Sequence, residues 1–362
     1  MSFVINGRFL TRPMTGVDRV AMNLLTSLDR IWPVASLGRF TVAVPPGYDG
    51  RLTLEHGDVE PCGRLSGALW EQVDLPRHHR GATIFNPCNT APLLHTDNIV
   101  VIHDANVLDY PDSYSAPFRA WYGFLLPRLA RRASMVVTVS QHSAERLMAQ
   151  GITDTPAHVV PNGCDHFRPG AAEDSPRRRM FLFAGSPAAH KNAVLFAKLA
   201  ERFAGRDVEF VVAGSRDARA FGGAADTAPA SGNLTFLGRI EDDALARLYR
   251  EAAALVFPSY VEGFGFTPLE AQGFGCPVIS SDRAPMTETL GDSALFADPD
   301  DLNAWEVAAQ RILEEPGLAA RLSEAGRRNA RRYTWADAAD AYLGLILQVT
   351  GPEALPAAQP AA

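Results

Sequence analysis

The chain has 362 residues and a formal net charge of −7, with 47% hydrophobic and 21% charged residues. This balance excludes a disordered or fibrous chain, and the length predicts two domains. The four cysteines are widely spaced without a CxxC pair, which argues against a metal knuckle or redox motif. No stretch approaches the roughly 18 apolar residues of a membrane span, and no basic footprint of a nucleic-acid binder is present. We therefore expect a globular cytoplasmic protein with no nucleic-acid partner.

Strand and helix patterns alternate along the first half of the chain. Short apolar runs predict strands at residues 2–6, 40–44, 83–85, 99–102 and 135–139. A loop containing Thr15, Gly16 and Val17 precedes an amphipathic helix through residues 20–28. Because strands that alternate with helices form βαβ units, we expect a mainly parallel sheet.

A second alternating series begins after residue 179. Residues 169–179 combine two prolines, a glycine and three consecutive arginines without apolar periodicity, which is typical of a linker. Strands are then predicted at 180–184, 208–213, 234–237, 254–257 and 277–280, and helices at 192–203, 243–252, 268–274, 302–313 and 336–347.

These patterns predict an α/β protein with two Rossmann-like, doubly wound domains. Their expected bounds are 1–168 and 180–335, with a linker at 169–179, a helix at about 336–349 that packs back on the first domain, and a flexible tail at 350–362. Such sheets bind ligands beyond the carboxyl ends of their strands, so we expect ligands in a central cleft.

A loop with two glycines leads from an apolar strand into a helix and carries Glu262 at its start. Thr267 is expected as the N-cap of this helix, with Pro268 at the first helical position and Glu270 at the third. The unpaired amides and the dipole of a helix start form an anion site that fits a diphosphate. Alternatively, Thr267 and Glu270 form only a capping box. Glu262 caps nothing.

Lys191 is one of only two lysines in the chain. It follows a strand and a Gly-Ser loop, and it precedes Asn192, which we expect to cap the next helix. An ammonium group beside helix amides suits phosphate oxygens, whereas the alternative is a solvated loop lysine. The Gly-x4-Gly-Lys-Ser/Thr spacing is absent, which disfavours ATP hydrolysis.

Seven short motifs follow one another along the chain: Thr15-Gly16-Val17, Ile102-His103-Asp104, the segment from Val137 to Ser140, the Pro-Asn-Gly-x-Asp turn that ends at Asp165, the loop from Ala184 to Asn192, Leu237-Gly238-Arg239, and Glu262-x7-Glu270. In this order they resemble the motifs of the GT-B retaining glycosyltransferases of family 4. The resemblance covers most of the chain and implies the GT-B fold.

The resemblance also implies roles for individual residues. Glu262 would contact hydroxyls of the transferred sugar and His103 would reach the same sugar, so these two are the catalytic candidates. The donor-binding candidates are Gly16, Ser186, Lys191, Arg239, Gly263, Phe264, Gly265, Phe266, Thr267 and Glu270. Among them, Glu270 would contact the ribose of the nucleotide, and the backbone amides near Phe266 would hold the diphosphate. Asp104 and Ser140 are acceptor-side candidates. His190 departs from the family, since many relatives carry Arg there, and His103-Asp104 alternatively forms a structural turn.

Neither a metal nor another cofactor is expected. The acidic clusters at 241–243 and 298–301 are typical of helix starts, where carboxylates are stabilised by the dipole. The positive charge that neutralises the leaving diphosphate would then come from Lys191, backbone amides and Arg239.

Residues 118–132 mix aromatic residues with four arginines. One interpretation is peripheral contact with the anionic inner face of a membrane, where the family collects lipid-linked acceptors. The other, which the sequence favours, is a core-packed helix pair broken at Pro127 with a solvated basic face.

The sequence as a whole predicts a retaining, metal-independent hexosyltransferase of bacterial lipopolysaccharide or exopolysaccharide assembly. It would move mannose, or next rhamnose, from a nucleotide sugar to a saccharide or polyprenyl-linked acceptor. Catalysis would rest on cleft closure and on stabilisation of the leaving diphosphate. A nucleotide-sugar epimerase of the same fold and a non-catalytic carbohydrate-binding subunit remain alternatives.

Overall fold

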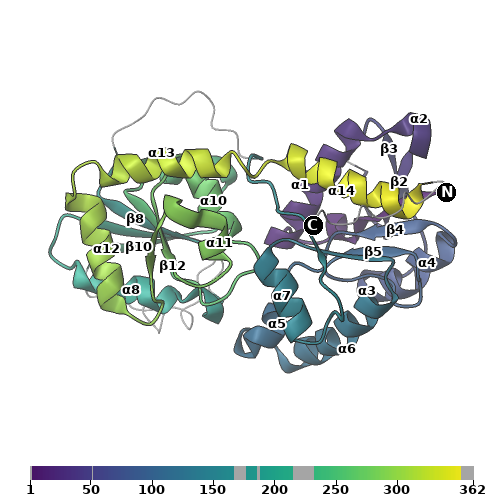
Figure 1. The fold of residues 1–362 in the computed structure, drawn as a ribbon, viewed down its shortest axis with the longest axis horizontal. Helices are drawn as coiled ribbons and strands as arrows, with labels where there is room; N and C mark the ends of the chain where they lie inside the picture. Colours follow the sequence, from purple (N-terminus) through teal and green to yellow (C-terminus); the bar gives the residue numbers. More distant parts are fainter. Residues whose placement is uncertain (1, 51, 167–176, 186–187, 215–231, 352–362) are drawn as a thin grey trace, which may run out of the picture. The chain divides into compact units, whose positions relative to one another are not determined.

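The chain folds into two compact units in the computed structural model, which describes residues 2–50, 52–166, 177–185, 188–214 and 232–351 (Figure 1). Unit 1 comprises residues 1–105, 116–162 and 335–362, and unit 2 comprises residues 106–115 and 163–334. The short segment 106–115 therefore lies in the unit formed mainly by the second half of the chain, whereas the expected boundaries assign it to the first domain.

Unit 1 is built on a seven-stranded parallel sheet in the order β3-β2-β1-β4-β5-β6-β7. The strands are β1 (Phe3–Asn6), β2 (Phe40–Val44), β3 (Gly57–Pro61), β4 (Thr83–Asn86), β5 (Asn98–Val101), β6 (Met135–Thr138) and β7 (His158–Val159). The strand order reverses at β1, between β2 and β4. In an open α/β sheet this is the point where loops diverge and ligands bind.

Helices cover both faces of this sheet (Figure 1). They are α1 (Gly16–Ile31), α2 (Val34–Leu37), α3 (Gly67–Leu69), α4 (Leu75–His78), α6 (Ala116–Arg132), α7 (Gln141–Ala149) and α14 (Trp335–Thr350), with a π-helix at Trp70–Asp74 and a 3-10 helix at Gly7–Thr11. The last helix, α14, packs against α1, and Tyr342 on it meets Phe85 of β4 edge-on at 5.6 Å between ring centroids. Helix α14 thus completes the core of unit 1.

Unit 2 repeats the plan with a six-stranded parallel sheet in the order β10-β9-β8-β11-β12-β13. Its strands are β8 (Met180–Ala184), β9 (Glu209–Ala213), β10 (Leu234–Gly238), β11 (Ala254–Phe257), β12 (Val278–Ser281) and β13 (Leu295–Ala297). Its helices are α5 (Asn106–Asp109), α8 (Ala193–Arg202), α9 (Asp242–Glu251), α10 (Phe266–Gly273), α11 (Met286–Leu290), α12 (Leu302–Glu314) and α13 (Leu318–Ala330), with 3-10 helices at Pro111–Ser113, Ala189–Lys191 and Gly291–Ser293. Here the order reverses at β8, between β9 and β11.

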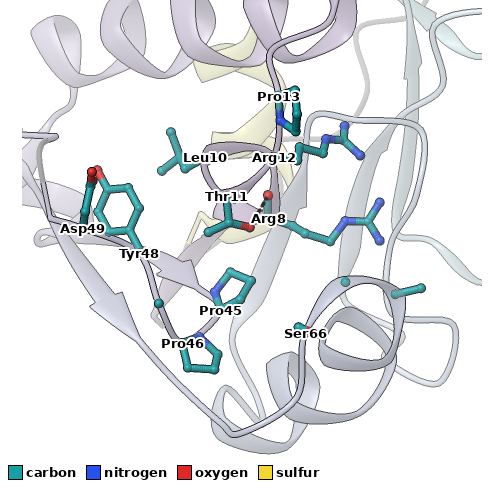
Figure 2. Close-up of a pocket in the computed structure, with 13 residues that line it drawn as sticks. Arg8, Leu10, Thr11, Arg12, Pro13, Pro45, Pro46, Tyr48, Asp49 and Ser66 are labelled. Atoms are coloured by element: carbon teal, nitrogen blue, oxygen red, sulfur yellow. Dashed lines mark hydrogen bonds between the residues drawn. The ribbon is translucent and has the colours of Figure 1, made fainter.

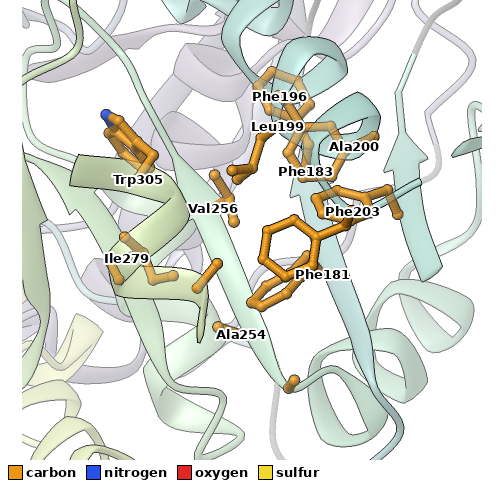
Figure 3. Close-up of a cluster of buried hydrophobic side chains, with 14 of the residues drawn as sticks. Phe181, Phe183, Phe196, Leu199, Ala200, Phe203, Ala254, Val256, Ile279 and Trp305 are labelled. Atoms are coloured by element: carbon orange, nitrogen blue, oxygen red, sulfur yellow. The ribbon is translucent and has the colours of Figure 1, made fainter. Parts of the chain in front are cut away.

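Buried aromatic rings fill one face of this second sheet (Figure 3). Phe181 and Phe210 from neighbouring strands lie 5.4 Å apart, and Phe196 of α8 meets Phe210 at 5.3 Å. Trp305 of α12 is fully buried in the same cluster. Strands of a parallel sheet are covered by helices on both faces, so both sets of their side chains are buried. This burial explains why the strands are continuous apolar runs in the sequence.

Most strand predictions are confirmed to within about one or two residues, and so is the α/β class. The predicted break at Pro127 is wrong, because Pro127 lies inside the single helix α6. The edge strands β3, β7 and β13 were missed because they are short or carry polar residues. Most of the expected linker and nearly all of the expected tail lie outside the described residues. Within the residues that are described, no helix is both long and apolar enough to cross a bilayer.

Candidate active site

Lys191 and Glu262 meet at the carboxyl ends of two neighbouring strands in unit 2. Lys191 ends the 3-10 helix that follows β8, and Glu262 lies in the loop after β11. The Lys191 Nζ donates to the Glu262 Oε1 in an ion pair, with side chains 18% and 12% exposed. The ammonium also lies 5.2 Å from the centre of the Phe257 ring. The fold therefore joins two predicted site residues at the point where the strand order reverses.

The helix after Glu262 begins earlier than the sequence predicted. Gly265 is its N-cap with φ +84°, a left-handed conformation that favours glycine, and Phe266 is its first residue. Thr267 is consequently the second residue of α10 rather than its N-cap, and Pro268 is the third. Because the N-cap has no side chain, partners for the first amides must come from elsewhere. This arrangement suits an anion at the helix start.

Glu270 does not form the alternative capping box with Thr267. It is the fifth residue of α10, and only 6% of it is exposed. Its Oε1 lies 3.0 Å from Nε2 of His166, and its Oε2 accepts a 3.5 Å hydrogen bond from the Tyr249 hydroxyl. The His166 ring stacks on Phe266 at 5.2 Å. His166 follows the Pro-Asn-Gly-x-Asp turn directly, and that position is the signal that could have identified it.

The segment 106–115 contacts the loop that carries Lys191. The Ser113 hydroxyl accepts a 3.2 Å hydrogen bond from the His190 amide and lies 3.0 Å from its Nδ1. Tyr114 stacks on the His190 ring, and Tyr110 stacks on Tyr260 at 5.8 Å. No sequence motif pointed to Tyr110, Ser113 or Tyr114, because these residues are distant in the chain from the loop that carries Lys191.

His190 supplies no fixed charge beside Lys191. Burial, and then the charge of Lys191, lower the pKa of His190 to about 4, although Glu262 opposes this shift. The imidazole is therefore neutral near pH 7. Among His190, Lys191 and Glu262, only Lys191 is cationic. The family members that carry Arg at the position of His190 have two adjacent cations there.

This depressed pKa predicts a pH-dependent stability. Between about pH 6.5 and about pH 4 the unfolded chain binds a proton at His190 that the folded chain does not, so the free energy of unfolding falls as the pH falls. We expect the variant His190→Asn to have a shallower decline in chemical denaturation across this window. The exposed His158→Asn is the control. Equal slopes for His190→Asn and the wild type would contradict the prediction.

His103 lies in unit 1, after β5, where it is almost fully buried. Its Nε2 donates to the Pro87 carbonyl at 2.8 Å, and its amide donates to the Asn89 Oδ1 at 2.8 Å. Burial is the main cause that lowers the pKa of His103, so the ring is neutral and its Nδ1 is the nitrogen without a proton. Both the structural turn and a neutral hydrogen-bonding role are compatible with this geometry.

The remaining predicted residues have varied surroundings. Gly16 is the first residue of α1, whose cap is the reciprocal pair of Thr15 and Asp18. Ser140 caps α7 by accepting from the Ser143 amide, and Asp104 is half-buried. In unit 2, Arg239 is exposed just after β10, and Gly263 and Phe264 are buried in the loop before α10. Ser186 lies outside the described residues.

The sequence predicted that the Asn192 side chain caps α8, but it does not. It adopts a left-handed backbone conformation with φ 52°, and its Nδ2 donates to the Pro299 carbonyl instead. The turn at Asn192 places Lys191 just before the helix.

The acidic clusters behave as helix starts. Asp242 and Asp243 are the first residues of α9, and Asp301 caps α12 by accepting from the amides of Asn303 and Ala304. Across the described ranges, no group of three or more His, Cys, Asp or Glu residues is placed to hold a metal ion.

Two family models match the chain. The model described as glycosyl transferases group 1 matches residues 170–329, and the one described as glycosyltransferase family 4 matches residues 68–168. Together they cover nearly all of unit 2 but less than half of unit 1.

Curated relatives include O-antigen chain mannosyltransferases. RfbU of Salmonella typhimurium is 30% identical over 65% of this chain and 66% of its own length. The O-antigen chain mannosyltransferase B of Escherichia coli is 34% identical over 29% of this chain and 27% of its length. The MMP alpha-(1->4)-mannosyltransferase of Mycolicibacterium hassiacum is 29% identical over 59% of this chain and 54% of its length. The matched region of this chain thus spans less than two thirds of the length of each of these relatives.

Solved structures share the fold at low sequence identity. A sucrose-phosphate synthase from Thermosynechococcus elongatus has a TM-score of 0.76 at 19% identity and covers 97% of this chain and 99% of its own. WaaG, a glycosyltransferase involved in lipopolysaccharide biosynthesis, has a TM-score of 0.68 at 14% identity with the same coverage. These similarities establish the architecture.

Proposed function

We propose, because this chain belongs to the GT-B glycosyltransferases of family 4 (group 1), that it transfers a hexose from a nucleotide diphosphate sugar to a saccharide acceptor with retention of configuration. The observation that carries this proposal is the Lys191–Glu262 pair in the same loop region as the glycine-capped start of α10. The helix amides and the ammonium suit a diphosphate, and the carboxylate suits sugar hydroxyls.

The mechanism follows from these groups. Lys191 and the amides of Phe266 and Thr267 stabilise the negative charge that develops on the leaving diphosphate. Glu262 exchanges its bond with Lys191 for hydroxyls of the donor sugar. The acceptor hydroxyl attacks the face from which the diphosphate leaves, and the departing phosphate oxygen takes the proton. An inverted product anomer, measured by NMR, would overturn this mechanism.

Mannose is the favoured sugar, with GDP-mannose as donor, and rhamnose from dTDP-rhamnose is next. The names of the three relatives above support mannose. The test is a thermal-shift screen with GDP, UDP and dTDP, followed by turnover of the matching sugar nucleotides with and without acceptor glycans. Stabilisation by dTDP but not by GDP would overturn the donor. Conversion of the donor without an acceptor would identify an epimerase instead.

Transfer should need no divalent cation. In this proposal Lys191, helix amides and the exposed Arg239 neutralise the negative charge of the diphosphate. Activity should therefore persist after dialysis against EDTA. Loss of activity that Mg²⁺ or Mn²⁺ restores would contradict this part of the proposal.

Ser113 acts here as a positioning residue. The variant Ser113→Ala removes the hydroxyl that holds the His190 amide, and a neutral hydrogen bond contributes about 0.5–1.5 kcal/mol. We therefore expect GDP affinity, measured by calorimetry, to fall roughly 2- to 10-fold with little change in kcat. The exposed Ser115→Ala is the matched control. An unchanged affinity would show that the contact does not position the Lys191 loop.

A lipid-linked acceptor on the cytoplasmic side of the membrane completes the proposal. Helix α6 supports it, because Phe118, Trp121 and Phe124 are about 40–46% exposed on a segment with four arginines and no acidic residue. Co-sedimentation with phosphatidylglycerol vesicles should fall for Trp121→Ala. Equal sedimentation of that variant and the wild type would remove the membrane contact from the proposal.

A further inference from the structure

A second carboxylate of unit 2, Glu270, lies on the helix whose start suits the diphosphate. Glu262 precedes Phe266, the first residue of α10, by four positions, and Glu270 follows it by four, which is about 6 Å along a helix. In the proposed function Glu262 binds the hexose and the first amides of α10 bind the diphosphate, which leaves Glu270 without a role. Because a carboxylate can only accept hydrogen bonds, a ligand group beside Glu270 must be a donor such as a hydroxyl.

Glu270 retains acceptor capacity although it is buried. Within the described ranges its polar contacts are His166, whose Nε2 lies 3.0 Å from Oε1, and the Tyr249 hydroxyl, which donates to Oε2 at 3.5 Å. The second distance is longer than that of a typical hydrogen bond. The two oxygens of a carboxylate offer about four lone-pair sites, and 7% of the Glu270 side chain remains exposed. Oε2 can therefore accept further hydrogen bonds from a ligand.

The buried Glu71 of unit 1 shows how this chain pairs a carboxylate more completely. Glu71 accepts hydrogen bonds of 2.9–3.0 Å from Asn6, Arg8 and Thr90, and its side chain is 3% exposed. Its partner Arg8 also lines a cavity of about 670 Å³, which Figure 2 shows. A guanidinium thus matches the charge of Glu71, whereas no arginine or lysine among the described residues pairs with Glu270.

His166 holds one oxygen of Glu270 and is itself held in place. Its ring stacks on Phe266 at 5.2 Å between centroids, and its side chain is 10% exposed. The turn before it is anchored by Cys164, whose amide donates to the Tyr333 carbonyl at 2.9 Å. Because a carboxylate oxygen only accepts, the Nε2 that lies against Oε1 carries the proton. A partner fixed in this way pre-organises the carboxylate.

The composition of a nucleotide sugar identifies the ligand group. With the hexose at Glu262 and the diphosphate at the start of α10, the ribose is the group on the other side of the diphosphate. We propose that His166 is a positioning residue, which fixes the Glu270 carboxylate to accept from the ribose 2′-hydroxyl and thereby favours ribonucleotide over 2′-deoxyribonucleotide donors. Resemblance to the family implies the ribose contact of Glu270, whereas His166 lies outside the seven motifs. The inference rests on the proposed function above.

The experiment is calorimetric titration of the full chain with GDP and with dGDP. The wild type should bind GDP about 10- to 150-fold more tightly than dGDP, as the loss of a hydrogen bond to a charged group predicts. His166→Phe keeps a ring against Phe266 but removes the N–H group, so the ratio of the two affinities should fall at least about fivefold. His166→Gln, which offers a side-chain N–H at similar reach, should restore part of the ratio. The exposed His158→Phe is the matched control.

The ratio separates positioning from structural damage, because damage to the fold weakens GDP and dGDP alike. His166→Asn, whose side chain is shorter, replaces His166→Phe if thermal unfolding shows that His166→Phe is not folded. Equal affinities of the wild type for GDP and dGDP, or a wild-type ratio in His166→Phe, would overturn the inference. A ratio in His166→Gln no higher than in His166→Phe would also overturn it.

Failure of this inference is distinguishable from failure of the proposed function. Transfer from a sugar nucleotide, by a chain whose ratio does not depend on His166, would leave the glycosyltransferase proposal standing without this role. A preference for GDP that depends on His166, without transfer from any sugar nucleotide, would leave the ribose contact and remove the proposed activity.

Discussion

The variant Lys191→Ala should bind GDP about 10- to 150-fold more weakly than the wild type, since a hydrogen bond to a charged group contributes about 1.5–3 kcal/mol. The loss has two causes. The ammonium that would neutralise the diphosphate is gone, and Glu262, whose side chain is only 12% exposed, keeps an uncompensated negative charge beside it. Calorimetric titration of GDP measures the effect, and transfer should fall at least as far.

The chain itself provides the control for this experiment. Lys198 is the only other lysine, and it lies exposed on α8. Lys198→Ala therefore removes the same charge from the same unit without touching the candidate site, and it should bind GDP like the wild type. Equal GDP affinity of Lys191→Ala and Lys198→Ala would remove Lys191 from the donor site.

The variant Glu262→Gln should lose roughly 100- to 1,000-fold in kcat, which is typical for removal of one group that stabilises a transition state. The amide keeps the shape of the side chain but not its charge. Because Lys191 is released from its ion pair with Glu262, GDP should bind no more weakly than to the wild type. Initial rates with the donor found in the screen and GDP titration together measure the two effects.

Glu288→Gln serves as the matched control, because Glu288 is an exposed carboxylate on α11 of the same unit. Its rate should equal that of the wild type. Turnover by Glu262→Gln at the wild-type rate would show that Glu262 makes no contact that matters in the transition state. Much weaker GDP binding by Glu262→Gln would instead indicate that the ion pair holds the Lys191 loop in place.

Local sequence rules were sufficient for most of the framework. Buried parallel strands such as β8 and β11 are continuous apolar runs bounded by turn residues, so periodicity and length identify them. The same rules failed at the start of α10. Thr267, Pro268 and Glu270 satisfy the preferences of the first helical turn, yet the left-handed Gly265 lets the helix begin at Phe266.

Contacts between distant segments were beyond those rules. The ion pair of Lys191 with Glu262 joins residues 71 positions apart, and Ser113 reaches His190 across 77. The ion pair of Arg8 with the buried Glu71 joins residues 63 positions apart, and no spacing in the sequence signals it. Burial of His190, which lowers its pKa, likewise depends on the aromatic residues packed around it.

The sequence by itself determined the two α/β units, the family and the types of residue at the candidate site, because apolar periodicity and glycine-rich turns are encoded within a few neighbouring positions. Only the tertiary structure decided which of those residues meet and which are neutral. The physical reason is that charge pairing, burial and cavity shape depend on side chains that folding brings together from strands far apart in the chain.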